Sequence, residues 1–490
     1  MASAFISILY ILCLIVIALF SMMQFYLLIN YLFSQKENSE ASTEEDFDWP
    51  DVTIQLPVYN EPNVIGRLLE TIIKLDYPRS KLFIQILDDS TDLTSDIIHQ
   101  KTKQYKAQGF QINHIRRLER TGFKAGALQY GMQIIDTPLV AIFDADFVPK
   151  PDFLKVSVPY FKDLQTGVVQ GRWTHLNQSY SLLTQMQAFQ LDTHFTIEQA
   201  GRFRGGSCLQ FNGTAGIWRK TAIESSGGWS SETLTEDLEL SYRAQLNGWK
   251  IVFLEDLEVP AELPASIRGL RSQQFRWMKG GAETAKKMIP VIWRSQMSFW
   301  QKCQASAHLC SSSVFIAILL MGICSIILPF SEPKIMYTEG VWPYFPVSTF
   351  ILLLVYMVSY VRVRTGKRFI FSDILFFMVL FPVFLATSMA MSLHNSKASL
   401  EGWIGLRSPF IRTPKTGFVK KNKNNGLSMF QKPDYQTIVE FFFFIIFILV
   451  ALYSYRVGET YLITIHMLFA VGFVTLVYFG IRNENVESHQ

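Results

Sequence analysis

Residues 139–153, LVAIFDADFVPKPDF, are the stretch of this chain that decides its fold. The apolar run from Leu139 to Phe143 predicts a buried strand, and two carboxylates, Asp144 and Asp146, follow where that strand ends. Ligands of open α/β sheets bind at the carboxyl ends of the strands. A D-x-D pair at that place can bind a hard divalent cation together with substrate phosphates, although two solvated turn acids would show the same pattern.

The chain around this stretch alternates short apolar runs with helical patterns over residues 51–260. Residues 52–56 and 82–87 have the character of strands, whereas 60–75 has apolar residues at helical spacing and the chain from Thr94 onward is helical again. This alternation predicts right-handed βαβ crossovers and a mostly parallel sheet. The first run leads into PVYNE and the run at 82–87 into DDSTD, so polar groups follow both strands at the edge where a nucleotide would bind.

Two further acidic motifs lie in the same region. Asp88 and Asp89 follow a predicted strand, where a carboxylate could accept hydrogen bonds from a base N–H or a ribose hydroxyl. Glu236 and Asp237 follow Thr235 at the start of a helical segment, so Thr235 could cap that helix and the two acids could favour its dipole. The alternative is that Asp237 is a general base directed at an acceptor hydroxyl.

A basic, amphipathic stretch at 261–307 carries another motif, Gln273-x-x-Arg276-Trp277. Apolar and aromatic residues recur there among Arg and Lys, which is typical of helices that lie on a membrane surface. Arg276 could neutralise a phosphate leaving group, and Trp277 could stack on a sugar ring. The alternative is that this Arg and Trp only extend from an interfacial helix into the lipid headgroups.

Long apolar segments flank the α/β region. Residues 4–33 are almost uncharged and long enough to cross a bilayer, whereas a cleaved signal peptide fits less well because the run is too long and has no basic start. Further crossings are predicted at 308–330, 343–361, 437–455 and 461–479.

The apolar run at 369–391 is ambiguous because both of its flanks are basic. RVRTGKR precedes it, and Lys and Arg recur between 397 and 423. Short loops rich in Lys and Arg stay cytoplasmic, so a single crossing would put one basic flank outside. We therefore predict that 369–391 is interfacial or re-entrant, which Asp373 and Pro382 within it also favour. The N-terminus is then outside, and residues 34–307 and the C-terminal tail are cytoplasmic.

Composition limits the possible partners. The net charge of +4 over 490 residues is too small to predict binding to nucleic acid. The five cysteines have neither metal-ligand spacing nor a disulfide framework, so we expect them to be reduced. The hydrophobic fraction of 49% is high for a soluble protein, and its clustering predicts separate membrane and soluble parts.

The four motifs in this order, D, DxD, TED and QxxRW, resemble those of family-2 glycosyltransferases, specifically the membrane-embedded cellulose-synthase superfamily. The segments QLPVYNE, ILDDSTD, GFKAGAL, AIFDADF, FNGTAGIWR and LNGWK are similar to cellulose-synthase-like glucan and mannan synthases. The resemblance is strong over about 50–285 and looser in the membrane region. It implies an α/β fold in which a cytoplasmic Rossmann-like (GT-A) glycosyltransferase domain is inserted between transmembrane helices.

The resemblance also implies roles for individual residues in the donor site. Asp88 and Asp89 would contact the uracil or guanine and the ribose of a nucleotide sugar, and Lys124 would pair with its diphosphate. Asp144 and Asp146 would bind the nucleotide sugar through Mg²⁺ or Mn²⁺.

On the acceptor side, the resemblance implies that Asp237, beside Glu236, removes the proton of the acceptor hydroxyl. Gln273, Arg276 and Trp277 would hold the end of the glycan and the departing diphosphate. The reaction would be a direct displacement at the anomeric carbon with inversion, so an α-linked nucleotide sugar would give a β-linked product.

Residues 410–415, FIRTPK, resemble the F-x-V-T-x-K gating loop of this family. The resemblance assigns Phe410, Thr413 and Lys415 to a loop that covers the bound nucleotide, although Arg412 stands where the family has Val. The alternative is a basic cytoplasmic loop near anionic lipid.

The expected domain order combines these segments. It is an N-terminal transmembrane helix (1–34), a linker (35–50), the glycosyltransferase domain (51–260), amphipathic interfacial helices (261–307), a transmembrane pair (308–361), an interfacial or re-entrant helix with a gating-like loop (362–436), a second transmembrane pair (437–479) and a cytoplasmic tail (480–490). We expect a multi-pass protein of a plasma, inner or Golgi-type membrane.

We therefore expect a processive hexosyltransferase that polymerises a β-linked glucan or mannan and extrudes it across the membrane. The favoured linkage is β-1,4. Its partners would be a nucleotide sugar, the growing glycan chain and the lipid bilayer, with UDP-glucose favoured slightly over GDP-mannose. Two alternatives stay open, a non-processive transferase that adds one sugar to a membrane lipid, and a transport or scaffold protein with an inert transferase-like domain.

Overall fold

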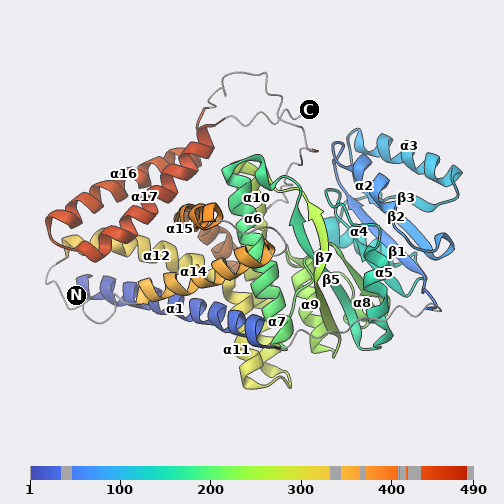
Figure 1. The fold of residues 1–490 in the computed structure, drawn as a ribbon, viewed down its shortest axis with the longest axis horizontal. Helices are drawn as coiled ribbons and strands as arrows, with labels where there is room; N and C mark the ends of the chain where they lie inside the picture. The colour runs from blue at the N-terminus through green and yellow to red at the C-terminus, as the bar shows by residue number, and fades with distance from the viewer. Residues whose placement is uncertain are drawn as a thin grey trace.

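The protein consists of an α/β domain beside a bundle of apolar helices, with α6 and α10 between the two (Figure 1). The computed structural model describes residues 2–34, 47–331, 344–364, 371–406 and 432–482, together with Ser408, Lys415 and Gly417. This arrangement confirms the predicted fold class, an α/β domain inserted between apolar helices.

A single seven-stranded sheet with the order β3-β2-β1-β4-β6-β5-β7 forms the centre of the α/β domain. Its strands are β1 (Val52–Val58), β2 (Leu82–Asp88), β3 (Gln111–Arg116), β4 (Leu139–Ile142), β5 (Thr166–His175), β6 (Gly216–Arg219) and β7 (Lys250–Ala261). β6 runs antiparallel to β4 and β5, and the other pairs are parallel, as the alternating sequence predicts. Because β2 and β4 lie on opposite sides of β1, a crevice is expected outside the ends of β1 and β4.

Helices cover both faces of this sheet because each has one apolar face to bury. They are α2 (Ile65–Ile72), α3 (Thr94–Ala107), α4 (Phe123–Met132), α5 (Phe153–Ser157), α6 (Leu182–Thr193), α7 (Ala200–Arg204), α8 (Lys220–Ser225) and α9 (Glu236–Leu246). Short 3₁₀ turns at Arg79–Lys81, Val158–Lys162 and Gln178–Tyr180 connect some of them, and a π-helix, η4 (His194–Gln199), joins α6 to α7. In α2, for example, Ile65, Leu68, Leu69 and Ile72 are fully buried.

The second half of the chain is almost entirely helical. Its elements are α10 (Ile267–Arg294), α11 (Phe299–Leu309), η5 (Cys310–Ser313), α12 (Val314–Ile327), η6 (Leu328–Phe330), α14 (Tyr344–Val363), α15 (Phe371–Ile404), α16 (Tyr435–Arg456) and α17 (Thr460–Ile481), and α1 (Ala2–Phe33) packs beside α12 and α14. Within the described ranges, six helical segments are long and apolar enough to cross a membrane, including α1, the run Phe299–Phe330 and α15.

Helix α15 covers the apolar run for which the sequence predicts an interfacial or re-entrant position. It is one continuous helix, so a re-entrant reversal of the chain does not fit it. At its start Asp373 contacts Arg364, two residues after Arg362, which lies 3.0 Å from Glu255 of β7. In Figure 1 α15 is seen nearly end-on, whereas α1, α12, α14, α16 and α17 run across the view.

The other end of α15 also lies on the side of the α/β domain. A Cβ added at Gly402 would come within 2.5 Å of the carbonyl oxygen of Lys279, so α15 and α10 touch through their backbones there. Two ends on one side support an interfacial helix rather than a crossing, and the membrane position of α15 stays a prediction.

The carboxylate of Glu255 on β7 links the sheet to α1, α7 and α14. It accepts hydrogen bonds from Tyr31 of α1 at 2.9 Å, Arg204 of α7 at 2.8 Å and Arg362 of α14 at 3.0 Å. Its side chain is only 5% exposed. A buried charge with three partners is costly to disturb, because removing it leaves Arg204 without a counter-charge and leaves Arg362 only the exposed carboxylate of Asp256.

Glu255→Gln is therefore expected to destabilise the protein by about 3 kcal/mol, the usual cost of breaking a buried ion pair. The neighbouring Asp256→Asn is the matched control, because Asp256 is 66% exposed and its carboxylate lies 3.1 Å from the same Arg362. Thermal unfolding of both variants in the same detergent measures the difference. Equal unfolding temperatures for the two variants would contradict this role of Glu255.

Candidate active site

A cavity of about 240 Å³ lies at the carboxyl ends of β1 and β4, where the crevice is expected. The structure brings the four motifs together there, although they are up to about 190 residues apart in the chain. The predicted site residues that line it are Asp89, Lys124, Asp144, Asp146, Glu236, Asp237, Gln273, Arg276, Trp277 and Lys415. Phe410 and Thr413, the other two residues assigned to the gating loop, lie outside the described residues.

Asp88 differs from the expectation and does not line this cavity. It is the last residue of β2, and its buried carboxylate accepts from Ser90 N at 2.8 Å and lies 2.8 Å from His114 Nε2. Burial by itself would raise the pKa of Asp88, but the hydrogen bonds from His114 and Ser90 outweigh it and lower that pKa. Asp88 therefore holds the loop that carries its neighbour, and its contact with a nucleotide stays a prediction.

Asp89 faces the cavity and is fixed by a residue that the sequence did not single out. Arg117, on the loop after β3, donates to both carboxylate oxygens of Asp89, at 2.9 Å and 2.5 Å. This bidentate geometry holds the carboxylate in one orientation. Close by, the guanidinium of Arg120 lies 3.4 Å from the ring centroid of Tyr59, so flat groups line the same end of the cavity.

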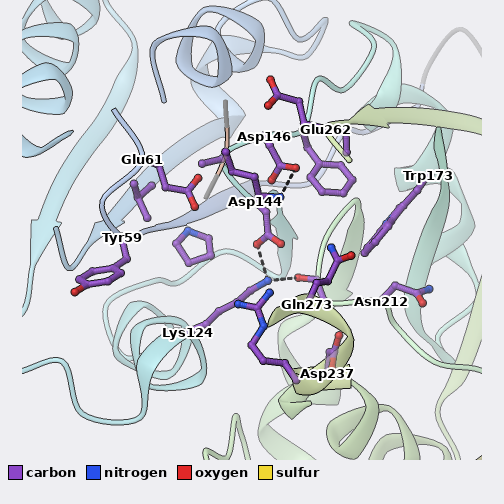
Figure 2. A pocket seen from close by; sticks show the side chains of 18 of the residues that line it. Tyr59, Glu61, Lys124, Asp144, Asp146, Trp173, Asn212, Asp237, Glu262 and Gln273 are labelled. Carbon is purple, nitrogen blue, oxygen red and sulfur yellow. Dashed lines mark hydrogen bonds and ion pairs between the residues drawn. The ribbon is translucent and has the colours of Figure 1, made fainter. Parts of the chain in front are cut away.

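The D-x-D carboxylates lie at the centre of the cavity, and each is paired with a lysine (Figure 2). Lys124 Nζ is 2.5 Å from Asp144 Oδ1 and 2.9 Å from the carbonyl oxygen of Gly213. Lys415 Nζ is 2.7 Å from Asp146 Oδ2. Burial lowers the pKa of both lysines, but the charge of the paired carboxylate outweighs it and raises them. The place beside each D-x-D carboxylate therefore favours a positively charged group.

The motif Thr235-Glu236-Asp237 starts α9 with both acids beside the cavity. Thr235 occupies the cap position, but its hydroxyl lies 3.1 Å from Thr284 of α10 and forms no cap hydrogen bond, so the capping interpretation does not hold for it. A Cβ at Gly213 would come within 2.7 Å of Asp237 Oδ2, and Gly213 has a φ of +79°. Only glycine fits at that position, because a side chain there would be strained and would displace the carboxylate.

Burial is the largest influence on the pKa values of Glu236 and Asp237. It raises the pKa of Asp237 to about 6, although the charge of Lys124 acts in the opposite direction. Burial and the adjacent charge of Asp237 also raise the pKa of Glu236. A carboxylate with a raised pKa is a stronger base than an exposed one, which suits Asp237 to accept a proton near neutral pH.

Activity is therefore expected to fall on the acid side of pH 6. A general base works only when it is deprotonated, and the protonated fraction of Asp237 grows as pH falls through a pKa near 6. The rate should drop about tenfold per pH unit below that value. The measurement is kcat/KM against pH between 4.5 and 8, which follows ionisation of the free enzyme, with nucleotide binding followed in parallel. A flat profile down to pH 5 would contradict the assignment.

Helix α10 presents Gln273, Arg276 and Trp277 on one face because they are three and four residues apart. Gly280 lets this helix approach the start of α9, since a Cβ there would come within 2.6 Å of Thr235. Lys279 is buried and contacts Leu406 and Ser408, which ties α10 to the chain after α15.

A second cavity of about 370 Å³ begins at the base of the first and continues between the apolar helices. Trp173, Asn212, Asp237 and Trp277 line both cavities. The wall of the second cavity is formed mainly by α1, α6, α11, α12, α14 and α15. A long substrate could therefore extend from Asp237 away from the D-x-D pair and into the helical bundle.

The sequence reasoning missed several residues of these walls. His194, Glu198 and Arg202 line the second cavity from η4 and α7, and Trp173 comes from β5. The spacing of four residues between His194, Glu198 and Arg202 was a usable signal, because charged residues at that interval share one helix face.

Comparison with known proteins places these features in a family. Residues 50–280 match the family model described as "Glycosyltransferase like family 2". The chain is 35% identical over 395 residues to glucomannan 4-beta-mannosyltransferase 1 of Oryza sativa subsp. japonica, covering 78% of this chain and 73% of that protein. It is 34% identical over 417 residues to glucomannan 4-beta-mannosyltransferase 2 of Arabidopsis thaliana, covering 82% and 74%.

A solved structure shares the fold. The mannosyltransferase PcManGT of Pyrobaculum calidifontis, in complex with GDP-Man and Mn²⁺, aligns with a TM-score of 0.57 over 82% of this chain and all of its own. The two sequences are 15% identical, so this similarity concerns the fold alone.

Proposed function

This chain belongs to glycosyltransferase family 2, within its cellulose-synthase-like branch, and we propose on that premise that it polymerises a β-1,4-linked mannan from GDP-mannose. The relatives that share a third of its sequence are named as glucomannan 4-beta-mannosyltransferases. The observation that carries the proposal is the meeting of the two cavities at Asp237 and Trp277. One cavity has the charges for a nucleotide sugar, and the other continues from it between the apolar helices, where the polymeric product would lie.

The donor is where this proposal departs from the sequence expectation. The overall resemblance slightly favoured UDP-glucose, whereas the relatives are named as mannosyltransferases. The groups at the Asp89 end of the cavity, with Asp89 fixed by Arg117 and flat side chains at Tyr59 and Arg120, do not distinguish the two nucleotide classes. GDP-mannose is therefore proposed from the relatives and not from a residue of the site.

The residues of this chain divide the chemistry between them. Asp237 accepts the proton of the acceptor hydroxyl, which attacks the anomeric carbon from the side opposite the diphosphate. Lys124, Arg276 and Lys415 line the same cavity and offset the charge that develops on the leaving diphosphate. Attack from the opposite side inverts the configuration and gives the β-linkage.

The D-x-D residues fit a divalent cation. Asp144 and Asp146 both line the cavity with carboxylates, the ligands that such a cation prefers, and the ammonium groups of Lys124 and Lys415 show that each position accepts a positive charge. These residues would hold Mg²⁺ or Mn²⁺, which supplies positive charge to the diphosphate when bound. Two carboxylates do not fill the coordination shell of such a cation, so the remaining ligands would be phosphate oxygens and water.

The membrane arrangement that we propose has five crossings. They are α1, the segment of α11 and α12, α14, α16 and α17, with α15 lying in the interface beside the active site. The contact of Lys415 with Asp146 agrees with this arrangement, because it requires the chain after α15 to be on the cytoplasmic side. An odd number of crossings leaves the N-terminus outside.

Product analysis tests the proposal. The purified protein in lipid is incubated with Mg²⁺ or Mn²⁺ and with radiolabelled GDP-mannose or UDP-glucose in separate reactions. A long product from GDP-mannose that a β-1,4-mannanase digests is the expected result. A polymer from UDP-glucose alone, digested by β-1,4-endoglucanase, would overturn the choice of donor. A single labelled sugar on lipid would overturn polymerisation.

A further inference from the structure

The wall of the second cavity carries a charged cluster that the reaction itself does not use. It consists of Gln24 of α1, His194 and Glu198 of η4, and Arg202 of α7, and we call it the Glu198 cluster. Glu198 Oε1 accepts from Gln24 Nε2 at 2.8 Å, and Oε2 lies 2.8 Å from His194 Nδ1 and 3.7 Å from Arg202. Most of this cavity is apolar, so a group of charges in its wall requires a reason.

Close helix packing builds the cluster. A Cβ at Gly201 would come within 2.4 Å of the carbonyl oxygen of Leu27, and one at Gly205 within 2.3 Å of Asn30. These two glycines let α7 lie directly against α1, which brings Gln24 to Glu198. The cluster is thus built into the fold and not a chance contact of flexible side chains.

Two polar atoms of the cluster have no partner among the described residues. Arg202 NH1 has none, although its side chain is only 8% exposed, and Gln24 Oε1 has none either. Both residues line the second cavity. Buried donors and acceptors are normally paired, so an unpaired guanidinium nitrogen beside a cavity indicates that a polar ligand or water completes it.

The Glu198 carboxylate is ready to accept further hydrogen bonds. Burial alone would raise its pKa, but the hydrogen bond from His194 and the charge of Arg202 hold that pKa at about 2. It is therefore ionised under all working conditions, and 23% of its side chain remains exposed. An acceptor and a donor side by side match the two roles of a sugar hydroxyl, which both donates and accepts.

The cluster is connected to the reacting end of the cavity. His194 Nε2 lies 3.2 Å from Asn212 Oδ1, and Asn212 lines both cavities beside Asp237. Trp173 lines both cavities as well, and its Nε1 has no partner among the described residues. The path from Asp237 to Glu198 therefore has polar groups and an aromatic face along one wall, as expected for a pocket that orients a ligand.

We propose that Glu198 and Arg202 form a glycan-binding subsite behind the acceptor end, where they hydrogen-bond the hydroxyls of a sugar that is already part of the chain. The subsite deepens the proposed function and rests on it. It positions the acceptor, because holding a previous sugar fixes where the terminal hydroxyl lies relative to Asp237. Glu198 and Arg202 are positioning residues and take no part in the displacement.

The test measures how β-1,4-linked manno-oligosaccharides and cello-oligosaccharides of one to four units bind to the full-length protein with nucleotide bound. Equilibrium dialysis with labelled sugar gives the affinity for each length. The wild-type affinity is expected to rise stepwise at the length that reaches the cluster. Glu198→Gln is expected to remove that step, a loss of about tenfold or more, as for one hydrogen bond to a charged group. Affinity for shorter sugars and for the nucleotide should stay within about twofold.

Two further variants keep the result interpretable. Arg202→Gln removes the unpartnered donor without touching the bonds of Glu198 to Gln24 and His194, so it should also remove the step if Glu198→Gln fails to fold. Glu224→Gln on α8 is the control for the charge change, because its side chain is 53% exposed and its carboxylate lies 3.7 Å from Lys220. This control should retain the wild-type length dependence.

The outcomes separate the subsite from the proposed function. Equal weakening at every length in both variants would mean a structural role and would overturn the subsite, as would wild-type protein that binds no tetrasaccharide. Length-dependent binding that depends on Glu198, without any transfer from GDP-mannose or UDP-glucose, would support the subsite and overturn the polymerase.

Discussion

Asp237→Asn is expected to lower the rate of sugar transfer by about 10³-fold while the affinity for the nucleotide sugar stays within about threefold, because the variant keeps its shape and loses only a general base. The carboxylate lies at the junction of the two cavities, where an acceptor hydroxyl must meet the donor. Asparagine has nearly the same volume, so the close approach of Gly213 is preserved.

The measurement is single-turnover transfer combined with direct binding of labelled nucleotide sugar. Asp152→Asn is the control, because Asp152 is exposed, has no side-chain hydrogen bond at the start of α5, and should behave as wild type. A large loss of nucleotide affinity in Asp237→Asn would show that the residue supports the fold of the donor site. Retained transfer would show that another group accepts the proton.

The second large effect is expected for Asp144→Asn, which should reduce kcat/KM for the donor by about 10³-fold. Asp144 is proposed to hold the cation and also pairs with Lys124 at 2.5 Å, so its loss removes a cation ligand and leaves the Lys124 ammonium without its counter-charge. The distinguishing sign is the metal titration. The Mn²⁺ concentration that gives half-maximal activity should rise at least about tenfold, since one of only two carboxylate ligands is gone.

Lys124→Met separates the two functions of Asp144. If Asp144 serves only as the partner of Lys124, this variant should reproduce the loss of activity in Asp144→Asn, and neither should change the metal titration. If Asp144 holds the cation, Lys124→Met should leave the metal dependence close to that of the wild type while weakening the affinity for the diphosphate. Isothermal titration with the nucleoside diphosphate and Mn²⁺ distinguishes these results.

Sequence patterns could predict the fold class and most of the residues that line the candidate site, because both predictions depended on short, local stretches of the chain. Leu139–Ile142 forms the buried strand β4, and Phe143 directly after it is buried as well. Asp144 then lies beside the cavity, as the D-x-D pattern predicts. Asp88 was the exception. The alternation of side chains at the end of β2 and the presence of His114 on β3 decide which of two adjacent acids is buried, and neither is visible in the motif DDSTD.

The assignment of α15 shows a second limit of local patterns. Its hydropathy suits a transmembrane helix, yet contacts at both of its ends, from Arg364 to Asp373 and from Lys279 to Gly402, support the interfacial position that the charge pattern of its flanks predicts. An apolar composition shows only that a helix can be in contact with lipid. The orientation of the helix relative to the membrane depends on the contacts at its two ends.

Local patterns in the chain show which groups are available: two acids after a strand, an acid pair at a helix start, and Arg and Trp on one face of an amphipathic helix. Periodicity and strand-end chemistry are local, so they can be read without coordinates. Only the tertiary structure decided that α10 lies against α9, that Arg117 fixes Asp89, and that Gln24 reaches Glu198 from α1. Those contacts join residues between 28 and 174 positions apart, and their geometry depends on how closely helices and strands pack rather than on any pattern within one segment.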